Sequence, residues 1–111
     1  MASIQKTLLT WNIWEIKDIE LLTLIIGRNG GMTTMRIIDL LLKRPLNKNQ
    51  ISKLLKLDYK TVTHHIKIII THDYICEIKI EKVNFYKPSD KLFSSIEEYK
   101  LIREHILNEK K

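Results

Sequence analysis

A row of cationic and hydrogen-bonding side chains is the feature of this 111-residue sequence best suited to chemistry. Its members recur every three or four residues: Lys60, His64, Lys67 and Thr71. That spacing places them on one face of a helix. The opposite face is aliphatic, with Val62, Ile66, Ile69 and Ile70, and Tyr59 lies close to it. A helix divided in this way can lie in the major groove of DNA, with one side buried in its own domain and the other facing the bases.

Two kinds of DNA contact are expected from this region. Lysine ammonium groups bind phosphates and supply affinity, whereas the first turns of a recognition helix reach base edges. For base contacts we expect Lys60, Thr61, Thr63 and His64. For phosphate contacts we expect Lys48, Lys53, Lys67 and Lys82. Because lysine lacks the planar fork of arginine, strict readout of guanine is not expected.

The positive charge is concentrated in the same part of the chain. The formal net charge of +6 falls wholly within residues 32–88, which carry eleven basic and five acidic residues. Residues 1–31 and 89–111 are each neutral. Between Lys43 and Lys67, seven basic residues accompany a single acid, Asp58. This distribution favours an anionic partner, and its coincidence with a helical cationic face favours nucleic acid over a membrane surface.

Other chemistries have little support in the sequence. His64 and His65 are adjacent and point in different directions on a helix, and His72 is two turns from His65, so no metal site is expected. The glycine-rich residues 27–31 lack the lysine and the serine or threonine of a phosphate-binding loop. No catalytic Ser–His–Asp or Cys–His arrangement can be argued from spacing. We therefore expect no enzyme, no cofactor and no identifiable small-molecule effector.

Two helices are expected at the start of the chain. The first runs to about Ile26, with Trp11 and Trp14 near its start, and ends at the glycines of residues 27–31. Its apolar residues at helical spacing are Ile16, Ile19, Leu22, Ile25 and Ile26. The second begins near Thr33 as its N-cap and ends before a proline at position 45.

Two capped helices follow, and together they predict a helix-turn-helix. Asn47 with Gln50 three residues later matches a capping box at the start of the third helix. Asp58 can cap the fourth helix, the cationic one, which we expect over residues 59–72. His65 is expected to pack at the edge of the core.

A β-hairpin is expected directly after the recognition helix. Residues 74–80 alternate between apolar and charged types, as in a half-buried strand. A tight turn at Glu81 and Lys82 leads into a second strand over residues 83–87. The hairpin corresponds to a wing, expected over about residues 74–87 and in contact with the DNA backbone. The predicted fold is therefore mainly α with a small β-hairpin, a winged helix-turn-helix with N- and C-terminal flanking helices.

The terminal helices suggest a homodimer. A last helix is expected from about Ser94, and both terminal segments are neutral and amphipathic. The expected interface residues are Ile16, Leu22, Ile96, Tyr99, Ile102 and Ile106. The domain boundaries follow: an N-terminal helical extension over residues 1–31, a DNA-binding domain over 32–88, and a C-terminal helix over 89–111 for dimerisation. If both helices only cap the monomer, no dimer would form.

The composition favours a cytoplasmic protein. Cys76 is the single cysteine, which excludes an internal disulfide. No signal peptide pattern or sufficiently long apolar run is present, so no membrane association is expected. The abundance of isoleucine and lysine suggests an AT-rich genome, which would fit an archaeal source.

The central region resembles archaeal winged helix-turn-helix transcriptional regulators of the ArsR-like superfamily. The resemblance covers about residues 30–88 and rests on Gly30-Gly31, Asn49-Gln50 and the DYKTV-x-HH pattern of residues 58–65. It implies DNA binding in the regulation of transcription. Such proteins usually have a glycine in left-handed geometry where this chain has Asp73, a residue type that tolerates that geometry. The paired cysteines of metal-sensing members are absent from the recognition helix, so the resemblance does not imply that this chain senses metals.

Two alternatives remain beside a sequence-specific DNA-binding regulator. A winged-helix module of the transcription machinery could use the same fold to bind protein, and the outward-facing Ile68 would favour that role. A non-specific architectural DNA binder would show the same salt dependence with little preference among sequences.

Overall fold

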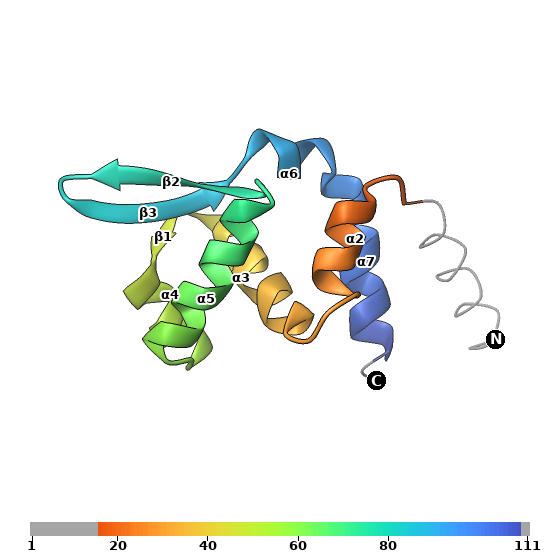
Figure 1. Ribbon diagram of the computed structural model, residues 1–111, viewed down its shortest axis with the longest axis horizontal. Coiled ribbons are helices and arrows are strands. Elements are labelled where there is room, and N and C mark those ends of the chain that lie inside the picture. Colours follow the sequence, from red (N-terminus) through yellow and green to blue (C-terminus); the bar gives the residue numbers. More distant parts are fainter. Residues whose placement is uncertain (1–15, 110–111) are drawn as a thin grey trace. The chain divides into compact units, whose positions relative to one another are not determined.

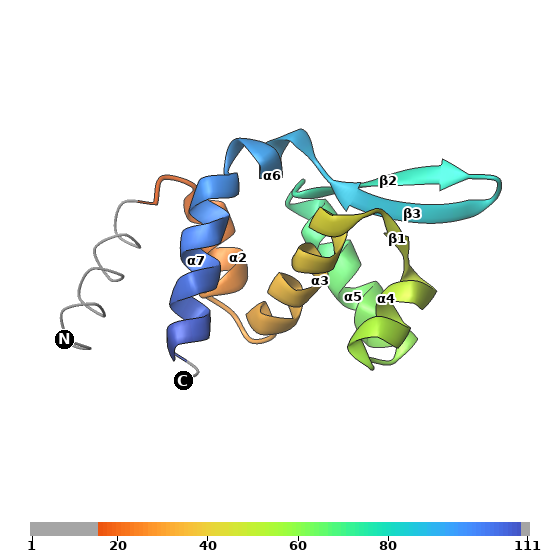
Figure 2. The ribbon, with the colours of Figure 1, turned by 180° about the vertical axis from the view of Figure 1, so that it is seen from behind.

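The computed structural model of the chain describes residues 16–109 (Figures 1 and 2). The expected roles of Trp11 and Trp14 lie outside the described residues. The described chain divides into two compact units, of which one combines residues 16–32 with residues 95–109. The other comprises residues 33–94 and is called the central unit below.

The first three helices of the central unit are α3 (Gly31–Lys43), α4 (Lys48–Leu55) and α5 (Tyr59–Thr71). The expected capping box begins α4, because the Asn47 side chain accepts from the Gln50 N–H at 2.8 Å and the Gln50 side chain accepts from the Asn47 N–H at 2.9 Å. Asp58 caps α5 by accepting from the Thr61 N–H at 2.7 Å. The two helices are joined by Lys56, which is left-handed at φ 57°.

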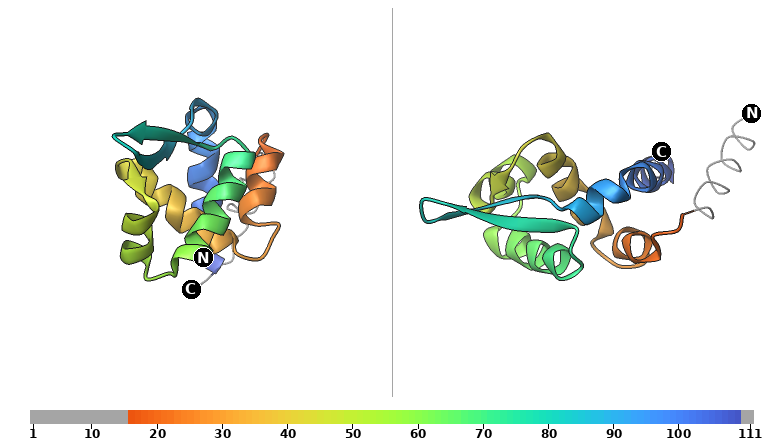
Figure 3. Two further views of the ribbon diagram at one scale, coloured as in Figure 1. Left: turned by 60° about the vertical axis from the view of Figure 1, so that its left-hand side comes forward. Right: turned by 90° about the horizontal axis from the view of Figure 1, so that it is seen from above.

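A three-stranded antiparallel sheet completes this unit, with the order β1-β3-β2. The expected hairpin is formed by β2 (Ile75–Ile80) and β3 (Val83–Pro88). It closes through Glu81 and Lys82, which have φ values of 56° and 96°. The third strand, β1 (Leu46–Asn47), was not anticipated: two residues show no periodicity, and they are extended because they pair with β3. Three helices followed by this hairpin form a winged helix-turn-helix (Figure 3).

The segment after β3 fastens the end of α5. It contains the short helix α6 (Asp90–Ser94). The Lys91 ammonium donates to the His72 carbonyl at 2.8 Å and lies 4.4 Å from the centre of the Tyr74 ring. The Ser89 hydroxyl donates to the Asp73 carbonyl. Asp73 itself has φ 68°, which confirms the left-handed geometry expected at this position.

A carboxylate network holds the unit that contains both terminal segments. Among the described residues its helices are α2 (Ile19–Ile25) and α7 (Ile96–Glu109), which pack against each other. Asp18 caps α2 through the Leu21 N–H at 3.0 Å and accepts from the Ser95 hydroxyl at 2.7 Å. Glu98 of α7 accepts from the backbone N–H groups of Lys17 and Asp18 at 2.7 and 3.2 Å. Two carboxylates therefore bind backbone groups at the start of α2.

Two expectations about the N-terminal half are wrong. Thr33 is not an N-cap, because α3 already begins at Gly31. A Cβ atom at Gly31 would lie 1.6 Å from the Ile25 carbonyl oxygen, so glycine allows the close approach there. The first helix begins only at Ile19, and its buried residues are Leu21, Leu24 and Ile25, of which the isoleucine spacing predicted only Ile25. Ile19 and Ile26 are exposed, so the helical phase differs from the one inferred from the isoleucine spacing.

The core of the central unit contains one polar pair. Its buried apolar residues include Met35, Ile37, Ile38, Leu41, Leu46, Ile51, Val62, Ile66, Ile69, Tyr74, Ile75, Tyr86 and Leu92. His65 is 7% exposed, and its Nδ1 lies 3.3 Å from the Thr34 hydroxyl. The histidine is thus buried against α3, deeper than the edge position expected for it.

Candidate nucleic-acid interface

The cationic face of α5 is exposed as the spacing predicted. The exposed residues of α5 are Tyr59, Lys60, His64, Lys67 and Thr71, while Val62, Ile66 and Ile69 are buried. Ile70, expected to be buried, and Ile68, expected to point outward, are both half-buried. Among the expected base-contact residues, Lys60 and His64 therefore present their side chains to solvent.

Thr61 and Thr63 are less accessible than the lysine and the histidine. Thr61 is half-buried in the first turn, where its N–H binds the capping carboxylate of Asp58. Thr63 is also half-buried, and its hydroxyl oxygen is covered without a hydrogen-bond partner among the described residues. A base contact through that oxygen would require the side chain to rotate.

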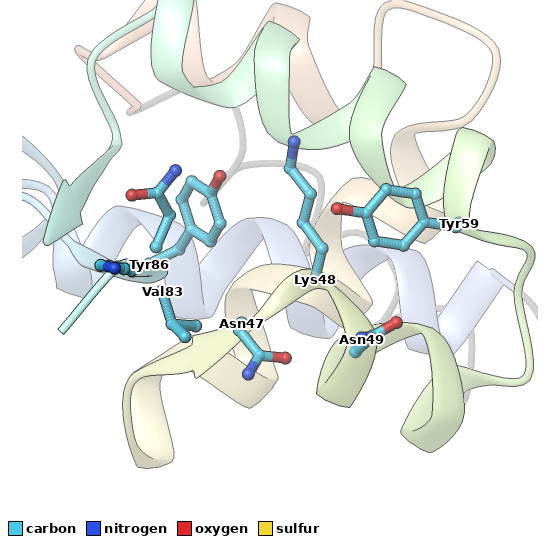
Figure 4. Close-up of a pocket in the computed structure, with 8 residues that line it drawn as sticks. Asn47, Lys48, Asn49, Tyr59, Val83 and Tyr86 are labelled. Carbon is cyan, nitrogen blue, oxygen red and sulfur yellow. The ribbon is translucent and has the colours of Figure 1, made fainter. Parts of the chain in front are cut away.

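A polar hollow lies between the start of α4, the start of α5 and the wing. Its volume is about 360 Å³, and it is lined by Asn47, Lys48, Asn49, Tyr59, Lys82, Val83, Asn84 and Tyr86. Lys48 extends between two aromatic rings, as Figure 4 shows. Its ammonium lies 5.8 Å from the centre of the Tyr59 ring and 6.0 Å from that of Tyr86. Cation–π attraction at these distances holds the ammonium between two elements that line the hollow.

A second hollow of about 250 Å³ continues along α5 and shares Lys48 and Tyr86 with the first. Thr63, Lys67 and Glu77 also line it. The Tyr86 hydroxyl donates to Glu77 Oε1 at 2.9 Å. Burial of the tyrosine, together with this hydrogen bond and the carboxylate charge, raises the pKa of Tyr86 to about 12. The phenol therefore stays protonated and keeps its donor role at neutral pH.

Three of the four expected phosphate-binding lysines lie along these hollows. Lys48 and Lys82 line the first, and Lys48 and Lys67 line the second. Lys53 is exposed on α4 and lines neither of the two. The groove formed by the two hollows thus gathers ammonium groups from α4, α5 and the wing turn.

Residue-by-residue interpretation of the sequence missed the two tyrosines and Asn84 in this groove. Tyr59 was read as a neighbour of the buried face, whereas its side chain is 52% exposed. Tyr86 and Asn84 lie in the second wing strand, where alternation indicated only which residues share a side. Their meeting with Lys48 depends on contacts between residues distant in sequence, for which the sequence offered no signal.

The expected dimer residues are partly covered within the chain. Ile16, Tyr99 and Ile102 are buried, at 5%, 1% and 0% exposed. In this conformation their side chains therefore have almost no exposed surface that a second copy could bury. The other three, Leu22, Ile96 and Ile106, are half-buried. The large apolar side chains exposed on α2, its C-cap and α7 are Ile19, Ile26 and Leu107.

The histidines and carboxylates do not assemble into a metal site in the described part of the chain. No group of three or more His, Cys, Asp or Glu side chains could hold an ion there. His64 and His65 meet edge-to-face with ring centres 5.6 Å apart, and His65 is buried against Thr34. Within residues 16–109, no helix has the length and apolar character needed to cross a bilayer.

Comparison with known proteins identifies related folds. No protein-family model matches the sequence, and no curated protein matches it. Among solved structures, the chain is similar to the adhesin competence repressor of Streptococcus pyogenes, with a TM-score of 0.57 and 22% identity over 68% of this chain and 59% of the repressor chain. A second structure of that repressor gives a TM-score of 0.58 at the same identity, covering 58% of the repressor. The matched region thus spans less than two thirds of the repressor's length.

The chain is also similar to HlyU from Vibrio cholerae. The reduced form gives a TM-score of 0.54 with 18% identity over 64% of this chain and 72% of HlyU. At these identities the likeness concerns the fold, a mostly helical winged helix-turn-helix with a small antiparallel sheet.

Proposed function

We propose that this chain is a sequence-specific regulator of transcription that binds double-stranded DNA as a homodimer. The observation that carries the proposal is the groove between α5 and the wing, where Lys48, Lys67 and Lys82 line adjoining hollows beside the exposed face of α5. In this proposal α5 enters the major groove. The wing contacts the DNA backbone.

The arrangement separates affinity from specificity. Lysines of the groove would bind phosphates on either side of the major groove and release counterions. Lys60 and His64 are exposed near the start of α5, the part of a recognition helix that reaches base edges. Thr61 would contribute less, because its side chain is half-buried and hydrogen-bonds to the Asp58 cap.

The similarity to a protein named as a repressor supports a regulatory role. The finer assignment, an ArsR-like regulator acting in the cytoplasm of an archaeon, rests on the sequence pattern of residues 30–88 and on composition. We propose no enzymatic activity and no cofactor.

We retain the terminal helices as the proposed dimer interface, with a changed set of residues. Of the side chains first expected there, the half-buried Leu22, Ile96 and Ile106 can still take part. Ile19, Ile26 and Leu107 expose more apolar surface and would supply most of the buried area. Two recognition helices would then meet successive major grooves roughly 34 Å apart. Light scattering at micromolar concentration contradicts a dimer if it detects only the 13.2 kDa species.

The test is a fluorescence-anisotropy titration of a random DNA library with selection of bound sites, repeated across a salt series. Recovery of a palindromic motif, with selectivity lost in Lys60→Ala and His64→Ala, would support the proposal. The matched control is Lys100→Ala, which removes an equal charge from a solvent-exposed pair on α7.

The other outcomes point to the two alternatives. Salt-dependent binding without an enriched motif would replace the proposal with an architectural DNA binder. No binding even at low salt would favour a protein-interaction module. The exposed Leu54 on α4 would then be the first residue to substitute in a search for a protein partner.

A further inference from the structure

The outer face of the wing carries an uncovered apolar patch. In the hairpin register, Ile80 lies opposite Val83 and Ile78 lies opposite Phe85, so all four side chains share one face. Ile80 and Val83 are 52% and 44% exposed, and Ile78 and Phe85 are half-buried. Cys76 extends the same face and is also half-buried. Most antiparallel sheets alternate apolar and polar faces, so an apolar outer face on a two-stranded wing points to a further contact.

The neighbouring edge of β2 is free to pair. The sheet order β1-β3-β2 leaves β2 at one edge. The residues that flank a two-residue hairpin turn form a hydrogen-bonded pair, here Ile80 and Val83. Hydrogen-bonded and non-hydrogen-bonded pairs then alternate along the two strands. The backbone groups of Ile78 therefore point to β3, while those of Glu77 and Lys79 point to the open edge. Such an edge is a template for another strand.

The charges along this edge select one register for self-pairing. A lysine on an edge strand usually discourages pairing with another strand. In this strand, however, Glu77 lies two positions before Lys79 on the same face, so each charge can face the opposite charge of a second copy. In an antiparallel pair centred on Ile78, each Glu77 would lie opposite the partner's Lys79. Centring the pair one residue earlier or later would instead place Glu77 opposite Glu77, or Lys79 opposite Lys79. Opposite charges stabilise a directly facing pair and like charges destabilise it.

We propose that two copies of this chain associate through their wings, with β2 pairing antiparallel to the partner's β2 about Ile78. The same register places Ile78 beside the partner's Ile78, and Cys76 beside the partner's Ile80. Both pairs fall on the apolar outer face, so one register satisfies the charges and buries the apolar patch. In Figures 1 and 3 the hairpin extends beyond the helices of its own unit, which leaves its free part accessible.

This association is separate from the proposed dimerisation through terminal helices and does not depend on DNA binding. The contact is small, because it joins a few residues of one strand from each copy. Interfaces below about 1,200 Å² are typical of weak and transient complexes. A covalent trap is therefore better suited than a mass measurement to detect it.

The experiment places a cysteine at the centre of the pair. In the chain that also carries Cys76→Ser, the cysteine introduced by Ile78→Cys would lie directly opposite the same cysteine of the second copy. The two residues would form a non-hydrogen-bonded pair with a Cα separation of about 4.5 Å, which is within the range that a disulfide spans. We expect rapid disulfide-linked dimer under mild oxidation. The matched control is Lys87→Cys in the same background, an exposed position on β3. Three strand spacings, roughly 14 Å across the sheet, and four residues along the strands would separate the two copies of this position, so it should cross-link at least 10-fold more slowly.

A second substitution guards against misfolding of the first. Ile80→Cys in the chain that retains Cys76 would form two disulfides per dimer, each from Cys76 to the substituted position of the partner. The unaltered chain should not cross-link, because four residues along the strand separate the two Cys76 side chains. Circular dichroism would verify that each variant keeps the fold.

Charge reversal then tests the register. Added to the Ile78→Cys, Cys76→Ser chain, Lys79→Glu should slow cross-linking about 10-fold, because two like-charge pairs replace two favourable ones. Adding Glu77→Lys to that variant should restore the rate. Damage to the Glu77–Tyr86 hydrogen bond could not be repaired in this way.

The results decide between clear alternatives. Cross-linking at both trapped positions, with rescue by the double charge reversal, would support the paired wings. Equal rates at Ile78→Cys and Lys87→Cys, or no rescue, would overturn the proposal. Cross-linking of the unaltered chain would equally overturn it, since it requires a different register.

Discussion

The two units of this molecule use their charged side chains in opposite ways. In the unit that holds both terminal segments, Asp18 and Glu98 accept hydrogen bonds from backbone N–H groups and the Ser95 hydroxyl. In the central unit, Lys60 and Lys67 project from α5 into solvent, and Lys48 lines the groove beside the wing. Carboxylates in the first unit stabilise a helix start, whereas ammonium groups in the second remain available to an anion. Net charge alone would not distinguish these roles.

The largest expected effect concerns the ammonium groups of the central unit. Replacing Lys48, Lys67 and Lys82 together by alanine should weaken DNA binding on the order of 100-fold at about 0.1 M salt, with a salt slope smaller by about three. Anisotropy titration across a salt series measures both. The matched control removes Lys17, Lys100 and Arg103 from the other unit. A comparable loss of affinity in the control would show that total charge, rather than the groove, determines binding.

The second prediction concerns Glu98, in the unit that holds both terminal segments. Glu98→Ala should lower the free energy of unfolding by about 1 kcal/mol, because two N–H groups at the start of α2 lose their acceptor. Urea denaturation followed by circular dichroism measures the change. Glu97→Ala is the control, since Glu97 pairs with Lys100 at 3.4 Å in an exposed position. Such surface pairs contribute little. Equal losses in the two variants would contradict the capping role.

Substitutions in the wing turn should affect the stability of the fold and the affinity for DNA in different ways. Lys82 has φ 96°, a backbone conformation that favours glycine. Lys82→Gly should therefore raise the free energy of unfolding by about 0.5 kcal/mol while weakening DNA binding through the lost charge. Lys82→Ala loses the same charge without relieving the backbone, so it should weaken binding equally and gain no stability. A stability gain in the alanine variant would show that the charge, not the backbone, is unfavourable.

The smallest effect is a pH dependence at the start of the recognition helix. The Thr61 hydrogen bonds lower the pKa of Asp58, and the charge of Lys60 adds to this. A carboxyl whose pKa is lowered on folding stabilises the fold above its unfolded pKa, about 3.9, and loses that contribution as the pH falls through the folded value. Asp58→Asn keeps a neutral cap. Thermal unfolding at pH 6 and pH 2.5 should show a smaller decrease of Tm for the variant than for the unaltered chain. An equal decrease would exclude a contribution from Asp58.

Local sequence signals predicted most of the central unit. The Asn47–Gln50 capping box, the Asp58 cap and the exposed face of α5 all follow from residue types at fixed spacing. The hairpin turn at Glu81 and Lys82 was placed correctly, although both residues adopt a conformation that usually favours Asn or Gly. These features depend on interactions within a few residues, which is why the sequence alone reveals them.

Features that depend on distant partners were not predictable in the same way. β1 is extended because it pairs with β3, and the phase of α2 is set by its packing against α7. Thr34 was not linked to His65, because 31 residues separate the two in the sequence. The groove was likewise anticipated only through its lysines. The aromatic rings that hold Lys48 come from α5 and β3, and only the folded chain brings them together.

The fastening of α5 behind the wing has a consequence for hydrogen exchange. Ser89 and Lys91 bind the carbonyls of Asp73 and His72, so the chain leaving β3 is tied to the chain leaving α5. Opening the hairpin at this end therefore releases the last turn of the recognition helix, and fraying of that turn loosens the hairpin. Amides of β3 and of the C-terminal turn of α5 should consequently exchange with deuterium through one shared opening, at a common free energy, rather than as two independent elements.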